Sequence, residues 1–198
     1  MTTNKNNVKR TILNFALLGE STVGKTQIIR RFYNFEFMTE AIGTIGVDFQ
    51  IQTYELKDKK KIKIKVWDTA GQERYNMVIT QLTQNCQGII LVYDITKKTT
   101  FDKLNEWYQK LQQKVTKKCP VIIVGNKSDL ENYREVKFQD GKLFADKLNC
   151  KFFETSAKEN QNIKTIFDEL INESYEIYKN EFSDNIALTD IKKKRKKC

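Results

Sequence analysis

The chain lacks any apolar run approaching the ~20 residues that a membrane-spanning helix requires. Its N-terminus, Met1 to Arg10, is polar and basic, without the apolar segment of a secretory signal. We therefore expect a cytoplasmic protein. The four cysteines, at positions 86, 119, 150 and 198, are widely spaced and form no CxxC pair, so the sequence predicts neither a disulfide nor a zinc site. A length of 198 residues fits one domain plus a tail.

The net charge of +10 is concentrated near the C-terminus. The run Lys192–Lys197 supplies six positive charges, and the rest of the chain carries only +4. A second lysine group, at positions 57–65, lies beside Glu55 and Asp58 between two predicted strands. We interpret that group as a solvated hairpin with edge lysines. No RNA- or DNA-binding signature accompanies either group, so we expect no nucleic-acid partner.

Residues 19–26 read GESTVGKT, which fits the pattern GxxxxGKT. They follow an apolar run typical of a buried strand and precede an amphipathic, helix-like segment. Backbone N–H groups of such a loop can surround phosphate oxygens. Lys25 can then reach the β- and γ-phosphates, and the Thr26 hydroxyl can bind Mg²⁺. The alternative is a glycine-containing turn with an accidental Lys-Thr pair, and the flanking strand and helix make that alternative the weaker one.

Strand-like and helix-like segments alternate along the chain. The strand candidates are residues 11–18, 47–56, 62–67, 88–93, 121–124 and 151–154. The helix candidates are residues 25–33, 99–115, 137–148 and 163–179. The runs GIILVYD and VIIVGN are continuously apolar, as expected of strands buried on both faces. This order predicts an α/β fold with a mostly parallel sheet covered on both sides, and a ligand at the carboxyl ends of the strands.

Further polar motifs follow the predicted strands. After the third strand, Asp68 can hold Mg²⁺ through water, Gly71 lets the backbone approach a γ-phosphate, and Gln72 could orient an attacking water. Thr44 lies between the phosphate loop and Asp68, where its hydroxyl could complete the Mg²⁺ shell. Each motif alone could be an ordinary polar loop, but motifs that each follow a separate strand indicate one shared site.

The motif Asn126-Lys127-Ser128-Asp129 points to the base of the nucleotide. One Asp129 carboxylate can accept from both N1–H and N2–H of guanine, whereas adenine would leave that carboxylate unpaired at a cost of ~1–3 kcal/mol or more. Lys127 can lay its methylene stem along the base, and Asn126 can brace the loops. The segment Glu154 to Lys158 offers backbone N–H groups toward guanine O6. The sequence therefore favours guanine over adenine.

Together these motifs resemble the Rab family of Ras-superfamily small GTPases over about residues 8–180. The Rab-like segments are IGVDF at 45–49, WDTAGQERY at 67–75 and LVYDIT at 91–96. The resemblance implies a P-loop GTPase fold, a six-stranded mostly parallel sheet flanked by five helices. It divides the chain into a flexible N-terminus at 1–10, a GTPase domain at 11–180 and a hypervariable polybasic tail at 181–198.

The resemblance also assigns site residues. It implies that the nucleotide GTP or GDP contacts Ser21, Thr22, Val23, Gly24, Lys25, Thr26, Gln27, Phe37, Thr44, Gly71, Asn126, Lys127, Asp129, Ser156, Ala157 and Lys158. It implies that Mg²⁺ is bound by Thr26 and Thr44, with Asp68 in its outer shell, and that Gln72 is catalytic. Residues 37–46 and 71–83 would be the two switch segments, ordered by the γ-phosphate and released on hydrolysis.

Partners and location are likewise implied by the family. No arginine stands at a position suited to act in cis, so we expect slow intrinsic GTP hydrolysis stimulated by a GTPase-activating protein. An exchange factor, a GDP-dissociation inhibitor and effectors are the other expected partners. Geranylgeranylation of Cys198, supported by the basic run, would anchor the chain reversibly to the cytosolic face of an endomembrane. A free terminal thiol is the alternative for Cys198.

Some positions depart from the usual Rab pattern. Ala41 stands where a tyrosine is common. Asn76-Met77 replaces the common Arg-Thr pair of the second switch segment, and the stretch LTQN at 82–85 replaces Tyr-Tyr-Arg-Gly. These changes leave partner identity open. Thr22 is β-branched where glycine or another small residue is usual, and we expect it to strain the phosphate loop and speed GDP release. Two other functions remain open at this point: a P-loop enzyme acting on ATP or a small metabolite, and a basic nucleic-acid-binding protein.

Overall fold

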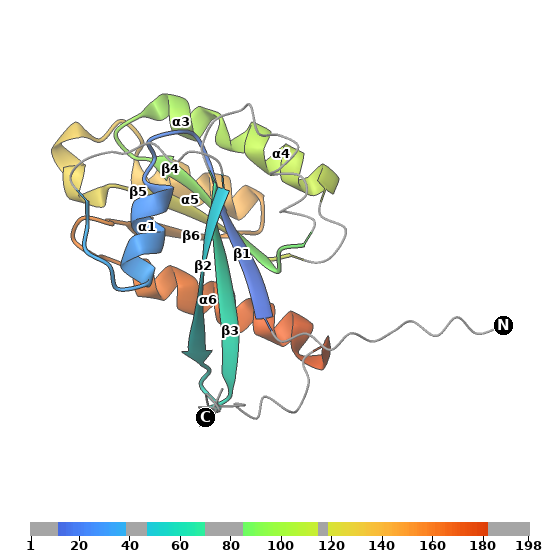
Figure 1. The fold of residues 1–198 in the computed structure, drawn as a ribbon. Helices are drawn as coiled ribbons and strands as arrows, with labels where there is room; N and C mark the ends of the chain where they lie inside the picture. The colour runs from blue at the N-terminus through green and yellow to red at the C-terminus, as the bar shows by residue number, and fades with distance from the viewer. Residues whose placement is uncertain (1–11, 39–46, 70–84, 115–118, 182–198) are drawn as a thin grey trace, which may run out of the picture.

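A six-stranded sheet with helices on both faces forms the core of the protein (Figure 1). The structure is a computed structural model that describes residues 12–38, 47–69, 85–114 and 119–181. The strands are β1 (Ile12–Leu18), β2 (Val47–Glu55), β3 (Lys61–Thr69), β4 (Gly88–Asp94), β5 (Val121–Asn126) and β6 (Lys151–Thr155). The helices are α1 (Lys25–Phe32), α3 (Lys98–Asp102), α4 (Leu104–Lys114), α5 (Phe138–Lys147) and α6 (Ile163–Tyr178), with short 3₁₀ helices η2 (Ser128–Tyr133) and η3 (Lys179–Glu181).

The strand order is β2-β3-β1-β4-β5-β6, and only the β2–β3 pair is antiparallel. Register brings the carboxyl ends of the parallel strands to one edge of the sheet, because Leu17 pairs with Asp68 and Asn126 pairs with both Asp94 and Thr155. We refer to this edge, where the sequence predicts a nucleotide, as the nucleotide edge. The β2–β3 turn, between Glu55 and Lys61, lies at the opposite edge.

Side chains of successive strand residues point to opposite faces of the sheet and form two apolar layers. On one face, Phe15, Leu17 and Val92 pack with α1 and α6, including the stacked rings of Phe32 and Phe167. On the other face, Leu18, Leu91 and Tyr93 pack with α4 and α5. Figure 1 shows α1 and α6 on one side of the sheet and α3 and α4 on the other. All seven β4 residues are buried, as the continuous apolar run predicts for a central strand.

The predicted fold class is confirmed, and each of the six predicted strands is present with ends shifted by no more than a few residues. The helix predicted at 99–115 is wrong in detail, because the chain forms α3 and α4 with a break at Lys103. The 3₁₀ helix η2 has no counterpart among the predicted elements. Within the described ranges, no helix combines the length and apolar character that crossing a membrane requires. The predicted division at residues 1–10 and 181–198 stays a prediction, because residues 1–11 and 182–198 lie outside the described part.

Candidate nucleotide-binding site

The phosphate loop leaves β1 at the nucleotide edge and leads directly into α1. Its backbone needs glycine at both ends. Gly19 has φ +141°, and a Cβ there would lie 2.1 Å from the carbonyl oxygen of Val92. Gly24 has φ +96°, and a Cβ there would lie 2.4 Å from Nδ2 of Asn126. Two close backbone approaches therefore explain the two glycines of the motif, and they press the loop against β4 and β5.

Lys25 lies folded into this loop. Its Nζ donates hydrogen bonds to the carbonyl oxygens of Gly19 and Glu20, each at 2.8 Å, and the residue is only 5 % exposed. Burial lowers the pKa of Lys25 to about 8, while the nearby carboxylates of Asp68 and Glu20 act in the opposite direction. A cation in a loop that leads into a helix N-terminus is a suitable receptor for phosphate oxygens.

Oxygen ligands suited to Mg²⁺ lie beside the loop. Thr26 and Asp68 line one cleft together with Asp48. Asp68 is buried at the end of β3, and the neighbouring Thr69 hydroxyl donates to the Leu17 carbonyl at 2.7 Å, which fixes this strand end against β1. In the described part of the chain no three His, Cys, Asp or Glu side chains could hold a metal by themselves. This donor set fits Mg²⁺, which retains waters and takes substrate phosphates as ligands.

Asn126 connects the phosphate loop to the segment that follows β6. Its Nδ2 donates to the Val23 carbonyl at 2.8 Å. Its Oδ1 accepts from the Thr155 hydroxyl at 3.0 Å and from the Ala157 N–H at 3.4 Å. The side chain is 1 % exposed, so these bonds are shielded from water. The bracing role predicted for Asn126 thus has a direct structural basis.

Asp129 and Lys127 are each fixed by one neighbour. The Ser156 hydroxyl donates to Oδ1 of Asp129 at 2.6 Å, which leaves the carboxylate oriented between η2 and the loop after β6. Lys127 has a left-handed backbone with φ 71°, and its Nζ lies 2.5 Å from Oδ2 of Asp94. Asp94 is fully buried, and its other oxygen accepts from the N–H and hydroxyl of Thr96. The Lys127 stem is therefore held in one position by a buried anion.

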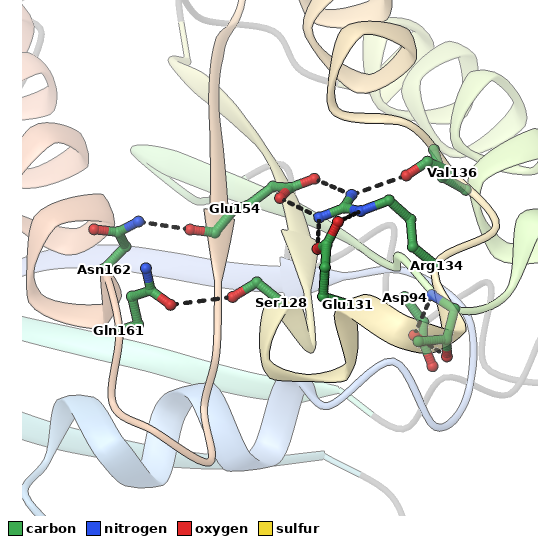
Figure 2. A network of polar contacts seen from close by, with 9 residues as sticks. Asp94, Ser128, Glu131, Arg134, Val136, Glu154, Gln161 and Asn162 are labelled. Atoms are coloured by element: carbon green, nitrogen blue, oxygen red, sulfur yellow. Dashed lines mark hydrogen bonds and ion pairs between the residues drawn. The ribbon is translucent and has the colours of Figure 1, made fainter.

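Arg134 joins η2 to the end of β6, as Figure 2 shows. Its guanidinium binds both oxygens of Glu154 at 2.7 and 2.8 Å and both oxygens of Glu131 at 2.6 and 2.8 Å. These contacts raise the pKa of Arg134, and they lower the pKa of the exposed Glu131 carboxyl. A second link in Figure 2 runs from Asn162 Nδ2 to the Glu154 carbonyl at 2.8 Å.

The remaining predicted site residues fall into two groups. Ser21 and Thr22 are exposed in the loop, and Gln27 exchanges two hydrogen bonds with the Met38 backbone. The carbonyls of Ala157 and Lys158 accept from Arg31 of α1. Phe37 is half-buried against the apolar layer of α1 and α6. Thr44, Gly71, Gln72 and Cys198 lie outside the described residues, so their predicted roles stay predictions.

Three residues of the site were missed by the sequence analysis. The sequence could have indicated Asp94 as a site residue, because Asp94 ends a buried apolar strand that is predicted to lie beside the strand preceding Lys127. Arg134 carried none, because its partner Glu154 is 20 residues away. Glu20 occupies a variable position of the loop motif, yet its carboxylate accepts from the Trp107 indole at 3.1 Å and pairs with Lys103 at 3.3 Å. Glu20 thereby fastens the phosphate loop to α4.

Comparison with known proteins places this site in a family. The family model described as Ras family matches residues 14–176. The chain is 43 % identical to "Ras-related protein Rab11A" of Lotus japonicus, over 84 % of this chain and 73 % of the relative. It is 39 % identical to "GTP-binding protein ypt2" of Schizosaccharomyces pombe, over 94 % and 96 % of the two chains. It is 41 % identical to human "Ras-related protein Rab-12", over 88 % and 73 %. The chain therefore belongs to the Rab family of small GTPases, which hydrolyse GTP and regulate vesicle traffic.

Proposed function

We propose that this chain is a guanine-specific switch whose base selectivity resides in Asp129. The observation that carries the proposal is a set of hydrogen bonds between the base loops and the phosphate loop. The Ser156 hydroxyl donates to Asp129, and its chain neighbours Thr155 and Ala157 donate to Asn126. Asn126 in turn donates to the Val23 carbonyl. In this proposal the phosphates contact the loop residues Ser21, Thr22, Val23, Gly24, Lys25, Thr26 and Gln27. The base contacts Phe37, Asn126, Lys127, Asp129, Ser156, Ala157 and Lys158.

Hydrolysis in this account depends on positioning and charge stabilisation. Lys25 presents its ammonium to the β- and γ-phosphates, and the Gly71 backbone approaches the γ-phosphate. Gln72 orients the attacking water, and an activating protein accelerates the slow intrinsic reaction. Thr26 and Thr44 would hold Mg²⁺ directly, with Asp68 behind them through water, and the bound ion would neutralise charge that develops on the phosphate oxygens. Exchange factor, GDP-dissociation inhibitor and effectors are partners in the same cycle.

Guanine selectivity can be tested with ITP, which lacks the 2-amino group of GTP. In the native chain Asp129 accepts from both N1–H and N2–H, so loss of one donor should weaken binding about 10- to 100-fold. In Asp129→Asn the amide N–H faces the 2-amino group, so GTP should lose its advantage and the GTP/ITP affinity ratio should approach one. Competition against a fluorescent GDP analogue measures both ratios.

A matched control is Asp140→Asn, which removes an exposed carboxylate from α5. It should keep the native GTP/ITP ratio. If Asp129→Asn also keeps that ratio, the base is recognised elsewhere and the assignment of Asp129 is wrong.

The proposed membrane location depends on the tail. We infer that geranylgeranylated Cys198 and the basic run Lys192–Lys197 anchor the active protein to the cytosolic face of an endomembrane, because one lipid chain needs a second signal for stable binding. The N-terminally tagged chain should mark one organelle in its native cell, and Cys198→Ser should be diffuse. A diffuse distribution of both forms would contradict lipid anchoring at Cys198.

A further inference from the structure

The turn between β2 and β3 carries a dense group of exposed lysines that the nucleotide cycle does not use. We define the lysine surface as Lys57, Lys59, Lys60, Lys61 and Lys63, all of them exposed. Within residues 55–63 the acidic residues are Glu55 and Asp58. Lys59 is paired with Glu55 at 3.2 Å, and Asp58 accepts from the Lys60 backbone. Lys57, Lys61 and Lys63 make no ion pair with another described residue.

Protection of the sheet edge does not explain these lysines. The edge strands of the sheet are β2 and β6, and β2, which forms this hairpin with β3, contains no lysine. Lys61 and Lys63 instead lie on β3, which is paired on both sides, by β2 and by β1. Their side chains alternate with the buried Ile62 and Ile64 and so face solvent. The interpretation as edge lysines is therefore corrected: the charge gathers on the outer face and the turn.

One lysine of the turn occupies a backbone position that suits another residue better. Its backbone closes through bonds from Leu56 N–H to the Lys60 carbonyl at 2.8 Å and from Lys59 N–H to the Leu56 carbonyl at 3.0 Å. Lys59 has φ 67°, a conformation in which glycine or asparagine is the less strained choice. A lysine at this position adds a cation at the tip at a conformational cost.

The lysine surface lies next to the last turns of α6. Nζ of Lys60 is 5.9 Å from the centre of the Tyr175 ring, and the Tyr54 hydroxyl donates to Asp168 of α6 at 2.6 Å. Figure 1 shows the β2–β3 turn and the end of α6 at the end of the sheet away from the phosphate loop. After η3 the chain continues into the segment that contains Lys192–Lys197 and Cys198.

We propose that the lysine surface binds anionic lipid headgroups and so fixes the orientation of the membrane-bound protein, an inference that rests on the proposed membrane anchoring of the tail. The chemistry favours a lipid surface. Lysines are hydrated point charges on flexible stems, suited to a flat layer of mobile anions, whereas arginine, absent from 55–63, serves shaped bidentate recognition. In this orientation the nucleotide edge faces away from the membrane and stays open to partner proteins.

The test uses the full, unlipidated chain and vesicles of phosphatidylcholine with or without phosphatidylserine. The triple variant Lys57→Gln, Lys61→Gln, Lys63→Gln should bind phosphatidylserine vesicles at least about tenfold more weakly than the native chain, and phosphatidylcholine alone should bind neither. A control variant with the same charge change, Lys110→Gln, Lys137→Gln, Lys147→Gln, alters exposed lysines of α4, of α5 and of the position just before α5, and should bind like the native chain. Arginine at 57, 61 and 63 should restore binding.

The outcomes separate this proposal from the tail anchor. A second variant neutralises Lys192, Lys193 and Lys194 instead. If that variant loses vesicle binding and the turn variant binds like its control, the lysine surface does not contact the membrane. The lysines then form a solvated hairpin or bind an acidic protein, and the proposed tail anchor is unaffected. If the turn variant loses binding and the tail variant keeps it, the lysine surface is supported and the basic run at 192–194 adds no measurable binding of its own, whereas anchoring through Cys198 is tested separately by Cys198→Ser. Unchanged GDP release in the turn variant confirms that the distant nucleotide edge is intact.

Discussion

Thr22 holds a left-handed backbone conformation in the phosphate loop, with φ 67°. For a β-branched residue this region is strained by about 1–3 kcal/mol. The strain was expected from the sequence because glycine or another small residue usually occupies this position. We predict that Thr22→Gly stabilises the loop in the conformation that surrounds phosphate and slows GDP release about fivefold or more. Displacement of a fluorescent GDP by excess nucleotide measures the rate.

Asn149→Gly provides the control for Thr22. Asn149 also has a positive φ, of 54°, but it lies between α5 and β6. Its replacement should leave GDP release unchanged. An unaltered release rate in Thr22→Gly would show that strain in the loop does not set the rate.

The low pKa of Lys25 predicts a pH dependence of nucleotide binding. Burial lowers this pKa from 10.5 to about 8 in the nucleotide-free protein, so folding is penalised below about pH 8 and the penalty is relieved as the pH rises to 10.5. Phosphate oxygens favour the charged ammonium and raise its pKa again. GDP affinity should therefore fall by up to about tenfold per pH unit above about pH 8, with proton uptake.

Calorimetry in buffers of different ionisation enthalpy measures that proton uptake. Lys25→Arg should bind GDP more weakly but without the decline, because its guanidinium stays charged. A decline of equal size in Lys25→Arg would place the titrating group elsewhere.

Asp94 is a further residue with a testable role. It is fully buried and its Oδ2 lies 2.5 Å from Nζ of Lys127. Asp94→Asn keeps the shape and removes the charge, so we expect Lys127 to lose its fixed position and GDP release to accelerate about tenfold. The release rate and the thermal midpoint should be measured together. A lower midpoint with a native release rate would assign Asp94 to stability alone.

At the level of elements, Arg134 joins η2 to the end of β6. Arg134 and Glu154 are nearly buried, with side chains 16 % and 13 % exposed, whereas Glu131 is 65 % exposed. We predict that Glu154→Gln lowers the free energy of unfolding by about 1–3 kcal/mol and speeds GDP release. Glu131→Gln should cost less than about 1 kcal/mol. Denaturant unfolding of the two variants gives the comparison, and equal costs would contradict it.

The elements were predictable to the extent that local patterns determine them. β4 and β5 are continuous apolar runs, so their burial and parallel pairing followed from the sequence. The loop residues of the site were found because their motifs are compact. The 3₁₀ helix η2 was not found, because contacts with residues far along the chain hold it, from Arg134 to Glu154 and from Ser156 to Asp129. The break at Lys103 was not found either, and Lys103 pairs with Glu20, 83 residues away.

At the level of the whole molecule, charge and topology separate two functions. The nucleotide edge gathers Asp68, Asp94, Asn126 and Thr155 at the carboxyl ends of neighbouring strands. The lysine surface lies at the opposite edge, beside the end of α6. The sequence indicated the nucleotide site and the group of lysines separately. It could not show that they lie at opposite ends of the sheet, because their relative position depends on the antiparallel β2–β3 pair and on the direction of α6.

The central claim is that the assembled site selects guanine nucleotides. The most direct measurement is competition of GTP and ATP, with Mg²⁺, for the full chain loaded with a fluorescent GDP analogue. The account predicts that ATP binds at least about 10³-fold more weakly than GTP, because adenine leaves the Asp129 carboxylate unpaired. An ATP affinity within tenfold of that for GTP would contradict guanine recognition by this site.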